Sequence, residues 1–148
     1  MFGNNLKFCR EELEMTQSEL GYIFGVSDSA IRSWENARDS MPLLKLIKFC
    51  NMYDYSADFV LGLNRKNIKY GKFKTNKSKI CTRLKELRKK LKITQQVLSD
   101  ECKISQTTYS GYETGHYLIN TTNLYYICKT YNISVDWILG RTKKINIK

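Results

Sequence analysis

Residues 15–36 read MTQSELGYIFGVSDSAIRSWEN, and residues 93–114 read ITQQVLSDECKISQTTYSGYET. Both segments have a Thr-Gln start, a leucine three residues after the Gln, an apolar residue followed by Ser, and an aromatic residue before Glu. Apolar residues recur in each at spacings of three and four, which is the period of a helix with one buried face. Each segment therefore predicts two short helices joined by a tight turn.

The two segments belong to a longer internal repeat with an offset of 78 residues. Without a gap, residues 6–62 align with residues 84–140, and 16 of the 57 positions are identical. A repeat of this length predicts two copies of one small domain, near the size of about 60 residues at which a domain can fold alone. We expect domains at residues 1–65 and 80–148, joined by a linker at residues 66–79 that holds six lysines and no acid.

Each copy is expected to contain helices only, because apolar residues recur at spacings of three and four and no stretch alternates convincingly between apolar and polar residues, as a strand would. Five helices are expected in each copy. In the first copy, Thr16 is expected to cap the second helix in a capping box with Glu19, and Gly25 is expected to end it. Ser27 is expected to cap the third helix, and Ser56 the fifth. The second copy repeats these caps at Thr94, Ser105 and Ser134. The expected fold class is all-α.

The two quoted segments resemble the phage-repressor helix-turn-helix family of the Cro/CI or Xre type. With the helices expected around each segment, the resemblance covers about 120 of the 148 residues. It implies two tandem lambda-repressor-like domains of five helices, in each of which the third helix enters the major groove of DNA. It also implies that Arg10 pairs with Glu35, and Arg88 with Glu113, which would join the first helix to the end of the third.

The resemblance further implies which side chains face DNA. Gln17 and Gln95, at the start of the second helix, would touch a phosphate and brace the recognition helix. The exposed recognition positions would be Ser27, Asp28, Ser29, Arg32 and Ser33 in the first copy, and Ser105, Gln106, Thr107, Ser110 and Gly111 in the second. Four flanking residues complete the expected DNA-binding set: Arg38, Lys89, Lys90 and His116. Among these side-chain types, Gln can read adenine and Arg can read guanine through paired hydrogen bonds.

Charge distinguishes the two copies. Residues 1–65 hold 7 basic and 9 acidic side chains, whereas residues 80–148 hold 12 basic and 5 acidic side chains. Three glutamates of the first expected helix become lysines at the same repeat positions of the second copy. Because phosphate neutralisation supplies much of the affinity for duplex DNA, the second copy and the linker are the better-supported DNA-binding surface.

Two arrangements stay open at this point. In one, both copies bind a single operator, and the 14-residue linker, which spans at most about 46–50 Å, sets the spacing of half-sites about 34–36 Å apart. In the other, the second copy binds DNA while the first dimerises or binds another protein. Asp28 favours the second arrangement, because phosphates repel an acid on a recognition helix unless it accepts from a cytosine amine, whereas Arg32 and Arg38 favour the first. A homodimer is compatible with either.

No feature of the sequence indicates an enzyme. The five cysteines include no Cys-x-x-Cys pair, which argues against a zinc site or a dithiol motif, and the single histidine lacks the partners of a general base. We expect no catalytic residue, metal or cofactor. The N-terminus lacks the pattern of a secretory signal, and no apolar run approaches the roughly 20 residues of a membrane-spanning helix. These observations predict a cytoplasmic protein without membrane contact.

The sequence thus predicts a transcriptional regulator that binds specific sites in double-stranded DNA. By resemblance it would be a repressor of bacterial, phage or mobile-element origin. The alternative is a protein-interaction module, such as an antitoxin or an inhibitor of a host protein, whose DNA binding is autoregulatory.

Overall fold

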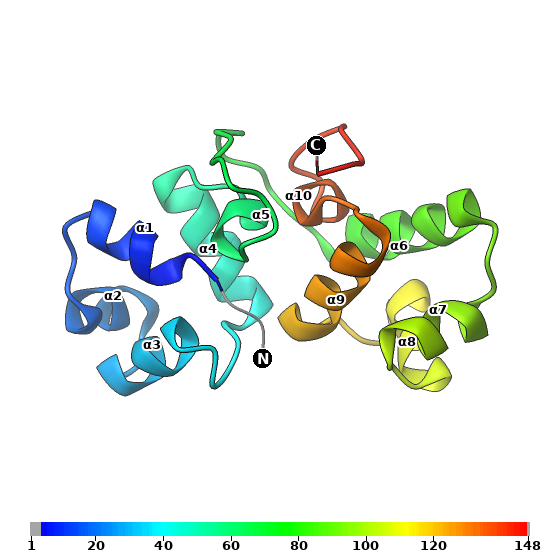
Figure 1. Ribbon diagram of the computed structural model, residues 1–148, viewed down its shortest axis with the longest axis horizontal. Helices are drawn as coiled ribbons and strands as arrows, with labels where there is room; N and C mark the ends of the chain where they lie inside the picture. Colours follow the sequence, from blue (N-terminus) through cyan, green and yellow to red (C-terminus); the bar gives the residue numbers. More distant parts are fainter. Residues whose placement is uncertain (1–3, 148) are drawn as a thin grey trace. The chain divides into compact units, whose positions relative to one another are not determined.

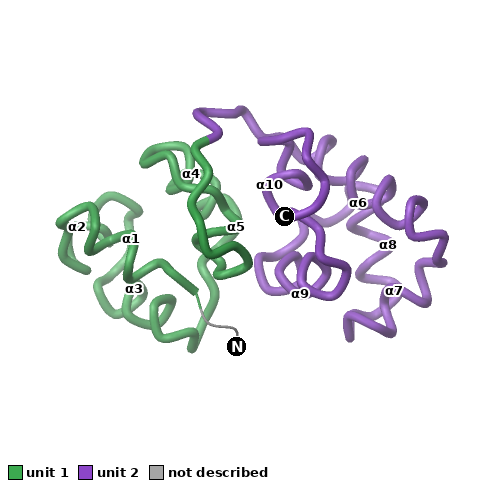
Figure 2. Tube along the Cα trace, turned by 45° about the horizontal axis from the view of Figure 1, so that its top comes forward, with its two compact units in different colours: residues 1–69 green, residues 70–148 purple. Residues whose placement is uncertain are grey.

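The structure is a computed structural model of the chain, and it describes residues 4–147. The chain divides into two compact units, residues 1–69 and 70–148 (Figure 2). Over the described residues each unit contains five helices, which Figure 1 labels. Over the described residues there is no β-strand, only an isolated bridge between Ile133 and Asn146. The expected all-α class and the tandem repeat of one fold are confirmed.

Corresponding helices follow the same order in the two units. Unit 1 contains α1 (Leu6–Glu12), α2 (Gln17–Phe24), α3 (Asp28–Glu35), α4 (Leu43–Tyr53) and α5 (Ala57–Val60). Unit 2 contains α6 (Lys77–Leu91), α7 (Gln95–Cys102), α8 (Gln106–Thr114), α9 (Thr121–Tyr131) and α10 (Val135–Ile138). In each unit the third helix packs against both the first and the second helix. The helix that would read DNA is therefore held from two sides.

The expected helix caps are present in both units. The Thr16 hydroxyl accepts from the Glu19 amide at 3.0 Å, and the Glu19 carboxylate accepts from the Thr16 amide at 3.3 Å, which forms the capping box. Gly25 ends α2 with a φ of 67°, and Lys103 ends α7 in the same left-handed conformation. The remaining expected caps each accept a backbone hydrogen bond through the side chain: Ser27, Ser56, Thr94, Ser105 and Ser134.

Equivalent repeat positions fill the two cores. Four pairs of residues are at most 2% exposed: Leu6 and Leu84, Leu20 and Leu98, Leu46 and Leu124, and Cys50 and Cys128. Four large aromatic residues at matching positions of the two units are also buried: Trp34, Phe59, Tyr112 and Trp137. The two units thus share a packing scheme, and the sequence differences between them lie mainly on the outside.

Of the 14 residues expected to form a free linker, those at both ends are attached to the two units. At its start, the Asn67 side chain donates to the Asp54 carbonyl at 3.0 Å and accepts from the Ser56 amide at 2.7 Å, which ties it to unit 1. At its end, residues 77–79 form the first turn of α6, because the Asn76 side chain caps that helix. Local hydrogen bonds, which the amino-acid composition does not predict, therefore fix both ends of this segment.

The middle of this segment is attached to unit 2 through a buried arginine. The guanidinium of Arg141 pairs with Asp136 at 2.5 Å, and neither side chain is exposed to solvent. The same guanidinium donates to the Gly71 carbonyl at 3.3 Å and lies 5.8 Å from the centre of the Tyr70 ring. Residues 70 and 71 thus belong to unit 2 rather than to a free connection.

The core assignment makes a prediction about stability. Leu98→Ala, in α7, removes a side chain with no exposed surface and should destabilise the chain by about 2–5 kcal/mol. Its neighbour Val97 is 39% exposed, so Val97→Ala should change the free energy of unfolding by no more than about 0.5 kcal/mol. Urea unfolding followed by circular dichroism measures both. Equal losses in the two variants would contradict the assignment of the buried face of α7.

Candidate nucleic-acid interface

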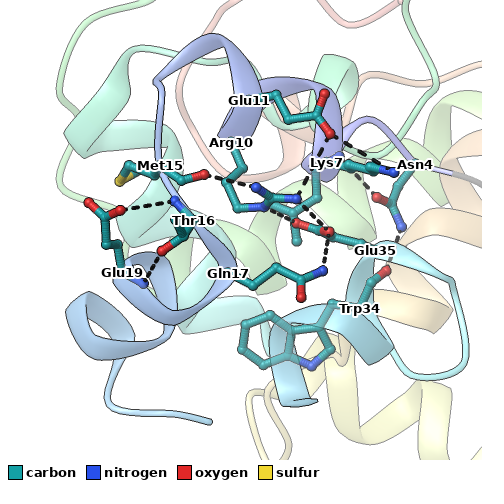
Figure 3. A network of polar contacts seen from close by, with 11 residues as sticks. Asn4, Lys7, Arg10, Glu11, Met15, Thr16, Gln17, Glu19, Trp34 and Glu35 are labelled. Carbon is teal, nitrogen blue, oxygen red and sulfur yellow. Dashed lines mark hydrogen bonds and ion pairs between the residues drawn. The ribbon is translucent and has the colours of Figure 1, made fainter. Parts of the chain in front are cut away.

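A buried ion pair joins the first and third helices of each unit. In unit 1, Arg10 Nε and Nη2 donate to the two carboxylate oxygens of Glu35 at 2.6 and 3.1 Å, and Nη1 donates to the Met15 carbonyl at 2.8 Å (Figure 3). In unit 2, Arg88 makes the same bonds to Glu113 at 2.7 and 3.1 Å. Both glutamate side chains are only 1% exposed. The structure therefore contains both pairs that the resemblance implied.

The glutamine that begins the second helix joins this pair. The Gln17 side-chain amide donates to Glu35 at 3.0 Å (Figure 3), and Gln95 donates to Glu113 at 3.1 Å. Each glutamine is therefore fixed against the end of the third helix through its amide nitrogen. One arginine, one glutamate and one glutamine thus connect three helices in each unit.

These contacts favour the charged forms of Arg10, Arg88 and Glu113. The pKa of Arg10 is raised chiefly by its hydrogen bonds to Glu35, and the pKa of Arg88 by those to Glu113. Burial would raise the pKa of Glu113, but hydrogen bonds from Arg88, Tyr109 and Gln95 outweigh it and leave the pKa below its ordinary value. The carboxylate is thus ionised at neutral pH despite its burial.

Most of the sequence-predicted site residues lie at the surface. Eleven are exposed: Ser27, Asp28, Ser29, Arg32, Arg38, Lys89, Lys90, Ser105, Gln106, Thr107 and His116. Four are half-buried: Gln17, Ser33, Gln95 and Ser110. Within unit 2, residues from the start of α7 and from α8 come together on one face. Lys89 and Lys90, by contrast, lie near the end of α6.

In unit 2, the recognition position at the start of α8 is braced by α7. The Nε2 group of Gln106 donates to Oε1 of Gln95 at 2.9 Å, while Gln95 in turn donates to Glu113. A continuous chain of polar contacts therefore runs from Arg88, in α6, to an exposed glutamine at the N-terminal end of the third helix. Thr107 follows directly and is also exposed.

Unit 1 places a different pair at the equivalent positions. Asp28 replaces the bracing glutamine, and its carboxylate lies 3.6 Å from the guanidinium of Arg32, one turn along α3. Both side chains are about half exposed. Since Asp28 has no amide to donate to Gln17, the polar chain of unit 2 has no counterpart here. Arg32, expected to contact DNA, is engaged with an acid on its own helix.

Other basic side chains of unit 1 are also committed to contacts within the unit. Lys45 donates to the Phe24 carbonyl at 2.8 Å and Lys48 to the Ile23 carbonyl at 3.3 Å, so both cap the C-terminal end of α2. Lys7 lies 3.9 Å from Glu11. By contrast, no ion pair of Lys89 or Lys90 occurs within residues 4–147, the part of the chain described. The excess positive charge of unit 2 is therefore presented to solvent.

One expected recognition position is not exposed. Gly111 is buried, because the ring of Tyr117 covers it. A methyl group on Gly111 would lie 2.7 Å from Cε2 of that ring and closer still to Cδ2, so a side chain there would require the ring to move. The expectation that Gly111 itself is an exposed recognition position is wrong for this reason.

Tyr117 is a residue of this face that sequence reasoning missed. It lies in the turn after α8, outside the two matching segments. The one local signal for it was a glycine inside a helix, which is unfavourable there and so calls for a packing reason. That signal does not identify the residue that fills the space.

The cysteines and acids offer no metal centre. Within the described part of the chain, no group of three or more His, Cys, Asp and Glu side chains is placed to hold a metal ion. Four of the five cysteines are buried, and burial raises the pKa of Cys9 to about 12, which disfavours its reactive thiolate form. Across residues 4–147, no helix has the length and apolar character needed to cross a membrane.

Comparison with known proteins agrees with the repeat. The chain matches the helix-turn-helix family twice, over residues 6–60 and 84–138, and it belongs to that family. It is 37% identical over 62 residues to an uncharacterized HTH-type transcriptional regulator, YobD, of Bacillus subtilis. It is 41% identical over 63 residues to the cryptic phage CTXphi transcriptional repressor RstR of Vibrio cholerae.

These similarities cover part of each protein. The matches take in 42% and 43% of this chain, and the chain spans about half the length of each relative, 55% of YobD and 56% of RstR. No solved structure matches the chain. The comparisons therefore identify the family of both repeats.

The buried ion pair predicts a pH-dependent loss of stability. Glu113→Gln should destabilise the chain by about 3 kcal/mol at pH 7, because it leaves Arg88 mostly buried without a charged partner. The folded pKa of Glu113 is lowered, so its contribution is complete above the unfolded value of about 4.3 and is lost as the pH falls through the folded pKa. The gap between wild type and variant should therefore close below about pH 4.

Urea unfolding at a series of pH values measures this gap. Glu86→Gln is the control, because Glu86 is an exposed acid on α6 and its loss should change the free energy of unfolding by less than about 0.5 kcal/mol. A constant gap from pH 7 to pH 3 would show that the charge of Glu113 does not stabilise the fold.

Proposed function

We propose that this chain is a transcriptional regulator that binds specific sites in double-stranded DNA through unit 2, and that it represses by occupying a promoter. The observation that carries the proposal is the braced, exposed Gln106 at the N-terminal end of α8. Membership of the helix-turn-helix family supports it, as do the relatives named as a transcriptional regulator and a transcriptional repressor.

The chemistry of Gln106 fits the recognition of adenine. A glutamine reads adenine by donating to N7 and accepting from N6 in the major groove. Its side-chain amide has two N–H donors, one of which is used by Gln95, so the second N–H and the carbonyl oxygen can both meet the base. The bond to Gln95 also fixes the rotamer before DNA arrives, which lowers the entropy cost of binding.

Binding to DNA also requires an attraction to the phosphates, which the positive charge of unit 2 supplies. Residues 80–148 carry 12 basic and 5 acidic side chains, and Lys89 and Lys90 are exposed. Neutralising phosphates with such lysines releases counterions from the duplex, which drives binding to any sequence. Bases are then selected by the side chains of α8. Unit 2 thus combines a sequence-independent attraction with a sequence-reading helix.

Unit 1 is better suited to a protein partner or to dimerisation than to reading DNA. Its recognition helix begins with an acid, and Arg32 is paired with that acid. Its outer surface also exposes apolar side chains, among them Tyr22 at 89% and Leu44 at 68%. Retention of the fold does not require retention of the DNA-binding role. Autoregulation by a protein-interaction module remains the second candidate function on this basis.

Selection of bound sequences from random duplex DNA by the full chain tests the proposal. A defined motif containing adenine is expected, and the double variant Gln106→Ala with Thr107→Ala should recover a much weaker motif while it still binds DNA, because phosphate contacts remain. Asp28→Ala with Ser29→Ala, at the matching positions of unit 1, should leave the motif unchanged. Loss of the motif with the unit 1 variant alone would reverse the assignment of the reading unit.

The salt dependence of binding tests the role of the lysines. Lys89→Glu with Lys90→Glu should weaken binding to every sequence and reduce the slope of log affinity against log salt by about 2, because two lysines no longer neutralise a phosphate each. Lys143→Glu with Lys144→Glu makes the same change of charge elsewhere on unit 2 and should reduce the slope less. Identical slopes for the two variants would mean that only net charge matters, not the face of α6.

A further inference from the structure

We infer that Tyr117, assisted by His116, contacts the sugar-phosphate backbone of DNA beside the base-reading positions of α8. The inference rests on the proposed function of unit 2. It assigns to this chain a binding residue that lies outside the helix-turn-helix segment. The main observation behind it is that the ring of Tyr117 covers Gly111. This contact places an exposed aromatic side chain against the recognition helix.

The ring occupies the place that a side chain of α8 would otherwise fill. Gly111 lacks a side chain, and a methyl group there would overlap the Tyr117 ring, 2.7 Å from Cε2. The Tyr117 amide also donates to the Gly111 carbonyl at 3.1 Å, which fixes the turn that carries the ring. A glycine inside a helix costs about 1 kcal/mol relative to alanine, so the contact with Tyr117 offers a physical reason for it.

The register of α8 puts this ring beside the recognition residues. Residues four apart on a helix are neighbours on one face, so position 111 lies one turn beyond Thr107. The N-terminal residues of a recognition helix contact base edges, and the surface further along lies nearer the edge of the groove. Gly111 is the sixth residue of α8, so the ring above it is expected at the backbone rather than at a base.

The side chain has the surface and chemistry for such a contact. Tyr117 is 48% exposed although one side of its ring is packed, and the described residues give its hydroxyl no hydrogen-bond partner. That hydroxyl can donate to a phosphate oxygen, which is a common contact of tyrosine with DNA. His116 is exposed and packs edge-on against the ring, with 4.6 Å between ring centres. The two rings hold each other in place.

Unit 1 lacks this arrangement at the matching positions. Ser33, Arg38 and Asp39 stand where unit 2 has Gly111, His116 and Tyr117. The turn itself is similar, because the Asp39 amide donates to the Ser33 carbonyl at 3.4 Å, as the Tyr117 amide does to Gly111. The aromatic residue, however, is replaced by an acid that phosphates would repel. Like the hydrogen bond between Gln106 and Gln95, this arrangement is found in unit 2 and not at the matching positions of unit 1.

Binding of the full chain to two duplexes tests the inference. One duplex carries the motif selected by the wild-type chain, and the other is a scrambled duplex of equal length and composition. Tyr117→Phe should weaken binding to both about 3- to 10-fold, the effect of removing one hydrogen bond, and Tyr117→Ala should weaken it further. The ratio of the two affinities should stay the same. Tyr126→Phe, a change of another exposed tyrosine on α9, is the matched control and should have no effect.

Gly111→Ala separates a contact with DNA from a role in folding. The added methyl group displaces the ring, so Gly111→Ala should lose as much affinity as Tyr117→Ala, and the double variant should lose no more than either single change. Circular dichroism must show unchanged helix content in each variant. Additive losses would mean that Gly111→Ala and Tyr117→Ala act through separate contacts and would overturn the inference.

The remaining outcomes distinguish this inference from the proposed function. If the wild-type chain binds the selected duplex and Gln106→Ala weakens that preference while the Tyr117 variants bind normally, the contact of Tyr117 is disproved and the function stands. A loss confined to the selected duplex would make Tyr117 a base reader and disprove the backbone contact. If the wild-type chain binds no DNA, both proposals fall together.

Discussion

The buried pair of Arg10 with Glu35, repeated as Arg88 with Glu113, is the interaction on which both units depend. A carboxylate removed from water is costly unless it is paired and hydrogen-bonded, and each glutamate here accepts from an arginine and a glutamine. Because the partners come from three different helices, the pair sets the position of the third helix against the first two. Hydrophobic packing alone would allow that helix more freedom to slide or rotate.

On this common frame, the two units have diverged at the surface. The inward residues and the caps are shared, whereas the outward residues of the third helices differ in charge and in the contacts they make. In unit 2 a glutamine brace extends the buried network out to Gln106. In unit 1 the network stops at Gln17, and the exposed pair of Asp28 and Arg32 neutralises itself. Surface changes of this kind cost little stability, so a duplicated fold can lose or change a function while it keeps its core.

The face of unit 2 that we assign to DNA is assembled from separate parts of the chain. Gln95 comes from α7, Gln106 and Thr107 from α8, and Tyr117 from the turn beyond it. Each part is held by a contact that is local in space: a hydrogen bond, an N-cap, or a ring on a glycine. Such contacts fix rotamers before a ligand arrives, and prior order lowers the entropy cost of binding.

The sequence by itself determined the repeat, the five helices expected in each copy, the caps at Thr16, Ser27, Ser56, Thr94, Ser105 and Ser134, and the two ion pairs implied by the resemblance. It could do so because helical period and capping are local properties, and because a gap-free repeat fixes which positions correspond. Only the tertiary structure decided that Gly111 lies under Tyr117, that Gln106 donates to Gln95, and that Arg141 holds residues 70 and 71 against unit 2. Helical period predicts which way a position faces, but not whether a side chain from elsewhere in the chain will cover it. That depends on how the turns bring separate segments together.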